Sequence, residues 1–257
     1  MWREHINIVS ENIRGLGVRA AKGRLAMRVA VSALALAIAA LMALRGDVAI
    51  LSFAAQWDAR TPVSRVRRDD GRIALTFDSG WGEDLTELVL NELEARQLRA
   101  TFFLTGYWID ENPDSARLIV EAGHELGGHS VTHSRMVGMD DGALDAEITG
   151  VSARIWELAG GMPRYFRPPY GDWDLRLLRR VRQQGQIAVT WSVDAQSLSP
   201  ANLSAALDSA RSGDIVLMGL SDAALGEVLG AALDDMLARG LKPGTVSELM
   251  GRGAHLV

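Results

Sequence analysis

The chain has 257 residues, 48% of them hydrophobic and 23% charged, which suits one domain of moderate size with an apolar core and a short additional segment. Its formal net charge of −5 argues against a nucleic-acid-binding protein, which would carry a basic stripe. It contains no cysteine, so disulfide bonds and cysteine-ligated zinc sites are excluded.

The N-terminal part of the chain differs from the rest. Residues 25–44 read LAMRVAVSALALAIAALMAL, about twenty apolar residues interrupted only by Arg28, which is close to the minimum that crosses a bilayer. Basic residues are denser before this run than after it, which predicts that residues 1–24 are cytoplasmic and the remainder extracytoplasmic. We therefore expect an uncleaved, single-pass signal anchor in the cell membrane. A cleaved signal peptide and a buried helix of a soluble protein are the alternatives.

Residues 45–71 are expected to form a linker, because RTPVSRVRRDDGR is charged and contains a proline. From residue 72 to 257, short apolar segments alternate with helical ones in about seven units. The strand-like segments are IALTF, ATFFLTG, HELGGHS, RYFRPPY, QIAVTWSVD and DIVLMG. This alternation predicts a mostly parallel α/β sheet or barrel.

Polar residues recur where the expected strands end. Asp78 follows IALTF, Arg167 follows the strand around Tyr165, Asp194 closes IAVTWSV and Gly219 closes DIVLM. The carboxyl ends of parallel strands share one rim of a barrel, and catalytic groups gather there. We therefore expect these distant positions to converge.

The two histidines of HSVTH lie four residues apart. On a helical turn His129 and His133 would face the same way and could bind one metal ion. Such a pair alone is a weak signal, and two solvent-facing or hydrogen-bonded histidines are the alternative. His124 is interpreted as structural, with a polar partner in a turn.

Asp78 and Arg167 are the other candidates for chemistry. A carboxylate at a strand end before a glycine turn could act as a general base, although an isolated aspartate more often caps a turn. Arg167 begins RPPY, where two prolines would make it a rigid donor to a carboxylate or a substrate oxygen. A structural ion pair is the alternative for this arginine.

Together, TFDSG, HSVTH, RPPY and VLMG occur in the order of the signature segments of the NodB-homology polysaccharide deacetylases (carbohydrate esterase family 4). The stretches IALTFDSGWGED, ATFFLTG, GHELGGHSVTH, YFRPPYGD, TWSVDAQS and GDIVLM resemble that family too, over nearly all of residues 72–250. The wording FDSGWG is most similar to the spore-associated branch of the family.

The resemblance implies a distorted (β/α)7 barrel that removes acetyl groups from N-acetylglucosamine or N-acetylmuramic residues. It implies a zinc-type ion that activates water, an aspartate base, an oxyanion group near the tyrosine of RPPY, and a late histidine acid. On this chain, the resemblance assigns the base to Asp78, two metal ligands to His129 and His133, the positioning of the base to Arg167, and the oxyanion group to Tyr170.

Three positions depart from the family pattern. Ser79 stands where the metal-binding aspartate is expected, Gly219 where the late histidine is expected, and Ser197 with Leu198 where an Asp-Trp pair is expected. Losing an acid–base group commonly lowers a rate by about 10²–10⁴. Two histidines also fall short of the three protein ligands typical of catalytic zinc.

Other groups could stand in for the missing ligand. Ser79 could bind the ion through water or weakly through its hydroxyl, Glu83 or Asp84 could substitute, and Asp78 could shift from base to ligand.

Aromatic and polar residues in the loops after the strands are candidates for sugar binding. Trp81, Trp173 and Tyr170 could stack on sugar faces, although ordinary packing is the alternative for each ring. Pro169 and Asp194 are further substrate-binding candidates in the same loops.

Two functions remain open at this point. The first is a membrane-anchored, metal-dependent hydrolase of C–N amide bonds that deacetylates a cell-wall amino-sugar polysaccharide. The second is a catalytically impaired glycan-binding or regulatory protein of envelope or spore assembly, motivated by Ser79, Ser197 and Gly219.

Overall fold

The computed structural model describes residues 60–82, 84–196, 199–251 and 255–256. The chain divides into two compact units, residues 1–51 and 52–257, and all described residues belong to the second. The predicted cytoplasmic segment 1–24, the predicted membrane anchor 25–44 and most of the predicted linker lie outside the described residues. Among the helices that are described, none has the length and apolar character needed to cross a membrane.

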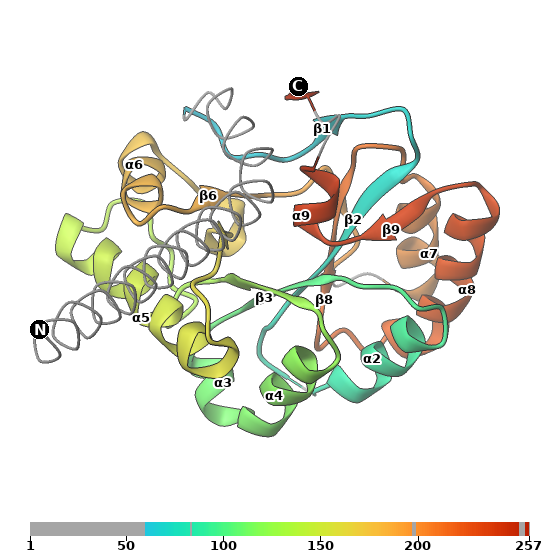
Figure 1. Ribbon diagram of the computed structural model, residues 1–257, viewed down its shortest axis with the longest axis horizontal. Coiled ribbons are helices and arrows are strands. Elements are labelled where there is room, and N and C mark those ends of the chain that lie inside the picture. The colour runs from blue at the N-terminus through green and yellow to red at the C-terminus, as the bar shows by residue number, and fades with distance from the viewer. Residues whose placement is uncertain (1–59, 83, 197–198, 252–254, 257) are drawn as a thin grey trace, which may run out of the picture. The chain divides into compact units, whose positions relative to one another are not determined.

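The centre of the unit is an eight-stranded sheet in the order β6-β5-β4-β3-β2-β8-β7, with β9 also paired to β2 (Figure 1). All these pairings are parallel. The strands of the sheet are β2 (Arg72–Asp78), β3 (Thr101–Leu104), β4 (Glu125–Gly128), β5 (Tyr165–Phe166), β6 (Ile187–Ala188), β7 (Val193–Asp194), β8 (Ile215–Gly219) and β9 (Lys242–Gly244). A separate antiparallel pair joins β1 (Val66–Arg67) to β10 (His255–Leu256).

Helices surround the curled sheet on its outer side (Figure 1). They are α2 (Thr86–Glu94), α3 (Gly106–Glu111), α4 (Pro113–Glu121), α5 (Asp141–Ala159), α6 (Leu175–Gln183), α7 (Pro200–Asp208), α8 (Leu225–Ala238) and α9 (Val246–Leu249), with the 3-10 turn η1 (Pro169–Gly171). Strand β2 is buried from Ile73 onward, as expected for a central parallel strand. Its Phe77 ring stacks on Phe102 of β3 at a centroid distance of 5.2 Å.

The sheet is curled but open among the described residues, because its edge strands β6 and β7 do not pair with each other. The coarser prediction of a parallel α/β barrel-like fold is confirmed, whereas the predicted seven-unit barrel is an eight-stranded, open sheet. A short extended segment, residues 63–66, lies beside β6 and β8 and is called here the seam segment. Val63 forms backbone hydrogen bonds with Ala188 and Thr190, and Val66 with Gly213, each at 2.9 Å.

The seam segment comes from the stretch that the sequence suggested as linker, yet Val63 and Val66 are almost fully buried. Its approach to β8 needs a glycine at position 213, where φ is +92° and a Cβ atom would lie 1.9 Å from the carbonyl oxygen of Val66. The described residues of the predicted linker therefore pack as part of the folded unit.

The predicted strand QIAVTWSVD is divided into β6 and β7. The chain changes partner between them, because Thr190 bonds to Val63 whereas the backbone N–H of Ser192 bonds to Ile215 of β8. The hydroxyl of Ser192 also donates to Asp214 at 2.7 Å. This switch places Asp194 in β7, which pairs with β8.

Candidate functional site

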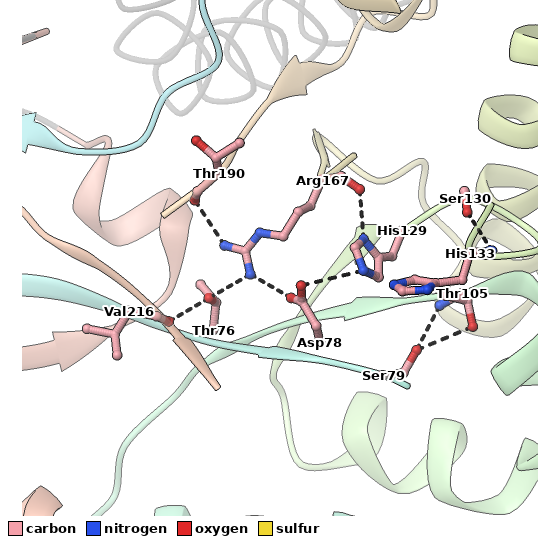
Figure 2. A network of polar contacts seen from close by, with 10 residues as sticks. All are labelled: Thr76, Asp78, Ser79, Thr105, His129, Ser130, His133, Arg167, Thr190 and Val216. Carbon is pink, nitrogen blue, oxygen red and sulfur yellow. Dashed lines mark hydrogen bonds and ion pairs between the residues drawn. The ribbon is translucent and has the colours of Figure 1, made fainter. Parts of the chain in front are cut away.

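Asp78 and Arg167, two of the four positions predicted to converge, meet at the carboxyl ends of the strands together with His129 (Figure 2). Asp78 is the last residue of β2, His129 follows β4 and Arg167 follows β5. Their side chains are at most 6% exposed. The parallel register of β2, β3, β4 and β5 brings these three residues together.

Asp78 and Arg167 form a buried ion pair. The guanidinium Nη1 donates to Asp78 Oδ1 at 2.5 Å and to Thr76 Oγ1 at 2.9 Å, and Nη2 donates to the Thr190 carbonyl oxygen at 3.2 Å. The guanidinium carbon lies 4.0 Å from the centre of the Phe103 ring. These contacts fix the arginine, which in turn fixes one carboxylate oxygen of Asp78.

His129 lies on the other side of the same carboxylate. Its Nδ1 is 2.7 Å from the carbonyl oxygen of Arg167, which can only accept, so Nδ1 carries the proton and Nε2 has the free lone pair. Nε2 lies 3.5 Å from Asp78 Oδ2. Burial lowers the pKa of His129, more than the neighbouring Asp78 raises it.

His133 packs against His129, with ring centroids 4.9 Å apart. Burial, followed by the neighbouring His129, lowers the pKa of His133 to about 4. Its Nδ1 atom is buried and has no hydrogen-bond partner among the described residues. Both imidazoles are therefore neutral at pH 7, the form that binds metal ions.

The predicted helical turn at HSVTH is wrong, although the two rings do come together. The segment is a loop in which Ser130 and His133 have positive φ angles of 66° and 56°. Ser130 Oγ accepts from the backbone N–H of His133 at 2.9 Å. Glu147 of α5 accepts from the backbone N–H groups of Val131 and Thr132 at 2.8 and 3.0 Å, which stabilises the loop against the helix.

The residues that could complete a metal site have other partners. Ser79 is 1% exposed, and its Oγ accepts from the Thr105 N–H at 2.9 Å. Asp84 accepts from the backbone N–H and the hydroxyl of Thr86 and from the Ser115 hydroxyl, so its carboxylate is engaged just before α2. Glu83 lies outside the described residues. Within the described ranges, no group of three or more His, Asp or Glu side chains is arranged to hold an ion.

The rim beside β8 lacks an acid–base side chain at position 219. A Cβ atom on Gly219 would lie 3.2 Å from Gln196 Nε2 and 3.3 Å from its Cγ. Asp194 is exposed and accepts from the Gln196 N–H at 3.1 Å, so its carboxylate shapes the local turn. Ser197 and Leu198 lie outside the described residues.

The RPPY loop places Tyr170 at the mouth of the site. Tyr170 has a φ of 61°, a left-handed conformation that is uncommon for a tyrosine and often marks a functional constraint. Its ring lies 4.7 Å from that of His133, and the Arg135 guanidinium lies 4.4 Å above it. Trp173, three residues further along the chain, is 39% exposed, whereas Pro169 is buried.

Sequence reasoning missed the residues that support this site. Thr76 lies two residues before Asp78, on the same face of the strand, and this period-two spacing is the signal that could have found it. Thr105 and Glu147 gave no signal, because their roles depend on contacts made across the fold. His124 was interpreted correctly as structural, since its Nδ1 accepts from the Ala100 N–H at 3.2 Å.

Comparisons with known proteins agree with this geometry. A family model described as polysaccharide deacetylase matches residues 65–189. The chain is 30% identical to the uncharacterized protein YlxY of Bacillus subtilis, over 74% of this chain and 60% of YlxY. It is 29% identical to the peptidoglycan-N-acetylglucosamine deacetylase PgdA of Listeria monocytogenes, over 70% of this chain and 39% of PgdA. This chain therefore spans less than two thirds of either relative.

Two further similarities cover more of the other protein. A chitooligosaccharide deacetylase of Bradyrhizobium is 32% identical over 61% of this chain and 77% of its own length. The crystal structure of BA3943 from Bacillus anthracis, described as a family 4 carbohydrate esterase pseudoenzyme, superposes with a TM-score of 0.70 and 26% identity over 74% of this chain and 69% of that one. A BA3943 mutant is described as having restored enzymatic activity. This chain belongs to the polysaccharide deacetylase family.

Proposed function

We propose that this protein is a slow hydrolase that removes N-acetyl groups from amino sugars of a cell-wall polysaccharide or peptidoglycan. One observation carries the proposal: Asp78, Arg167 and two neutral imidazoles meet at the carboxyl end of the sheet. The substrate class follows from the relatives named as peptidoglycan-N-acetylglucosamine and chitooligosaccharide deacetylases.

The residues of the chain support three parts of an acetamide hydrolysis. Asp78 is the general base, since its Oδ2 faces the imidazoles while Arg167 binds Oδ1 and fixes the direction of the carboxylate. His129 remains neutral because burial lowers its pKa more than Asp78 and the hydrogen bond to the Arg167 carbonyl oxygen raise it. The backbone N–H of Tyr170, in the strained loop beside His133, is the candidate oxyanion donor.

A divalent ion fits this site only in part. The free Nε2 of His129 and the unpartnered, buried Nδ1 of His133 are suitable donors, and two imidazoles favour zinc. A bound zinc ion would act as a Lewis acid on the acetamide. The third protein ligand is missing from the described residues, so we expect weak binding and assign no step of the reaction to the ion.

The test is acetate release from chito-oligosaccharides and from peptidoglycan, with and without added zinc. We expect slow release that falls by about 10²–10⁴ in Asp78→Asn, because the variant loses the base. Trp156→Ala is the matched control, since this exposed residue of α5 is remote from the strand ends and should leave the rate unchanged. Equal rates for the unaltered protein and Asp78→Asn would refute hydrolysis at this site.

A second function is favoured by the missing ligand and acid: a glycan-binding protein without turnover. Ser79 Oγ is engaged with Thr105, and Gly219 carries no side chain. A BA3943 mutant is described as having restored enzymatic activity, so restoring the missing side chains is an informative experiment on this chain too.

The double change Ser79→Asp with Gly219→His should raise acetate release by about 10² or more, because it supplies a ligand and an acid. A Cβ atom at position 219 would lie 3.2 Å from Gln196 Nε2, so the Gln196 side chain must shift to admit the new histidine. Activity already present without these changes would favour the enzyme, whereas glycan binding that survives His129→Ala, with no hydrolysis, would favour the binding protein.

The proposed location is outside the cell membrane, with residues 25–44 as the anchor and the folded unit extracytoplasmic. The apolar run and its basic flank support this location. Protease digestion of intact cells should remove the folded unit and leave the N-terminal segment, and full protection would contradict it. A role in sporulation rests on FDSGWG alone, and expression confined to sporulating cells would support that role.

A further inference from the structure

Two exposed aromatic rings lie together beside the candidate site. Trp81 is 62% exposed and Tyr107 is 41% exposed, and their ring centroids are 4.6 Å apart with a 46° angle between the planes. Exposed apolar surface of this kind commonly marks a binding site. We call Trp81 and Tyr107 the aromatic shelf.

The aromatic shelf is attached to the same rim as Asp78. Trp81 lies three residues after Asp78, and its carbonyl oxygen accepts from Ser221 Oγ at 3.0 Å, two residues beyond Gly219. The backbone N–H of Tyr107 donates to the Val131 carbonyl oxygen at 2.9 Å, within the loop that carries both histidines. The shelf therefore lies at the carboxyl end of the sheet, among the ends of β2, β4 and β8.

The start of helix α3 positions the Tyr107 ring. Thr105 caps this helix by accepting from Trp108 N–H, and its own N–H donates to Ser79 Oγ. The phenol hydrogen-bonds with Glu111 one turn later, and this bond raises the pKa of Tyr107. The shelf is thus preorganised, which lowers the entropy lost when a ligand binds.

Tyr170, the other aromatic side chain at the mouth, offers less free surface for stacking. The guanidinium of Arg135 lies over its ring at 4.4 Å, and Asp172 pairs with that arginine. The imidazole of His133 also packs against it. Among the described residues, Tyr107 is the only aromatic residue whose ring contacts Trp81, so most of the indole remains open to a ligand.

We propose that the aromatic shelf binds one sugar unit of an N-acetylated oligosaccharide, at least two units along the sugar chain from the unit at Asp78. The inference rests on the proposed substrate class and extends it to chains longer than a disaccharide. The C–H face of a pyranose ring is apolar and flat, which suits an open indole and phenol, and its hydroxyl groups point outward to polar side chains and solvent. Two rings cover far less than the roughly 800 Å² that a stable protein partner buries, which favours a sugar.

The experiment is calorimetric titration of the full-length protein with N-acetylglucosamine oligomers of two to six units. We expect affinity to rise with length in the unaltered protein. Trp81→Ala should weaken binding of the hexamer by about 5- to 20-fold and leave the dimer nearly unchanged, because the stacking contact is lost. Tyr107→Ala should have a smaller effect in the same direction, and Tyr107→Phe should retain binding because the ring remains.

Trp156→Ala is the matched control. Trp156 is 55% exposed near the carboxyl end of α5, and a helix that joins parallel strands runs back toward their amino ends, away from the shelf. Thermal melting of each variant checks that the fold is intact. Three results would overturn the inference: no binding of the hexamer by the unaltered protein, equal affinity for the hexamer with and without Trp81, or equal losses for dimer and hexamer.

Acetate release separates this inference from the proposed hydrolysis. Length-dependent binding that requires Trp81 in a protein that releases no acetate would support the shelf and refute the enzyme. Acetate release with hexamer binding independent of Trp81 would refute the shelf alone.

Discussion

Carboxylates lie at both ends of the sheet, and the two are stabilised differently. At the carboxyl end, Asp78 is 4% exposed and pairs with the fully buried guanidinium of Arg167. At the amino end, the partly buried Glu125 begins β4 and accepts from Thr101 Oγ1 at 2.6 Å, from Ser247 N at 3.2 Å and from the Ser247 hydroxyl. One carboxylate has a cation as its partner, whereas hydroxyl groups and a backbone N–H bond the other.

This difference in partners distinguishes the candidate functional site at Asp78 from a structural contact at Glu125. Hydroxyl groups do not compensate the loss of solvation of a charge as a guanidinium does, and burial raises the pKa of Glu125 despite its hydrogen bonds. Asp78 keeps a second oxygen directed at neutral imidazoles, where a substrate can reach it. The carboxylate at the amino end therefore contributes to stability, whereas the carboxylate at the carboxyl end is a charged group that a substrate can reach.

The largest effect is expected when the cation is removed. Arg167→Met should lower the free energy of unfolding by about 3–5 kcal/mol, because Asp78 is left buried without its partner. Urea denaturation measures the change. Adding Asp78→Asn to this variant should recover part of the loss, and a single variant that loses less than about 1 kcal/mol would contradict the assigned pairing.

At the amino end, Thr101→Val should cost about 1–3 kcal/mol. The hydroxyl donates to Glu125 and accepts from the Val246 N–H at 2.9 Å, so valine leaves the buried Val246 N–H without this partner and removes one hydrogen bond from Glu125. Thr76→Val is the matched change at the other end, where Arg167 keeps its bonds to Asp78 and Thr190. We expect Thr76→Val to cost less than Thr101→Val, and the reverse order would break the comparison.

Glu125→Gln should change how stability depends on pH. The folded protein holds the Glu125 proton more tightly than the unfolded chain, so this group's contribution falls as pH rises above its ordinary pKa of 4.5. Glutamine removes that loss, and the variant should gain stability relative to the unaltered protein as pH increases from 4 to 8. Unfolding free energies at several pH values measure this, and parallel pH profiles would contradict it.

The smallest effect on stability should come from His124, the residue before Glu125. Burial, then Arg99, lowers its pKa from 6.5 to about 4, and its neutral Nδ1 accepts from Ala100 N–H. The unfolded chain therefore binds the proton more tightly, and stability should fall by about 1 kcal/mol as pH drops from 6.5 toward 4, because the ring is partly exposed. The decline in stability should disappear in His124→Asn, which keeps a hydrogen-bond acceptor. A decline that persists in this variant would show that another group causes it.

The sequence predicted the parts of this molecule that follow from periodicity. Apolar runs located β2, β3 and β8, and the polar residues that follow the expected strands predicted that Asp78 and Arg167 would meet. It did not predict the loop that carries His129 and His133, because a four-residue spacing fits a helical turn equally well. That loop depends on Ser130 and on Glu147, sixteen residues beyond Val131.

Other features depend on contacts that no local pattern contains. Helix α3 was not predicted, since its six residues are too few for a periodic signal and its start is set by Ser79. Tyr107 was missed for the same reason, because its role appears only where Trp81 packs on it. The predicted strand QIAVTWSVD changes partner midway, which only the position of the seam segment explains.

The seam segment gives the chain a mechanical connection to the site. Val63 accepts from the Thr190 N–H, and the carbonyl oxygen of the same Thr190 accepts from Arg167. Tension applied to the chain upstream of residue 60 would load the Val63 bonds and reach the guanidinium through a single residue, Thr190. Such tension would thus act on the partner of Asp78 as well as on the seam segment.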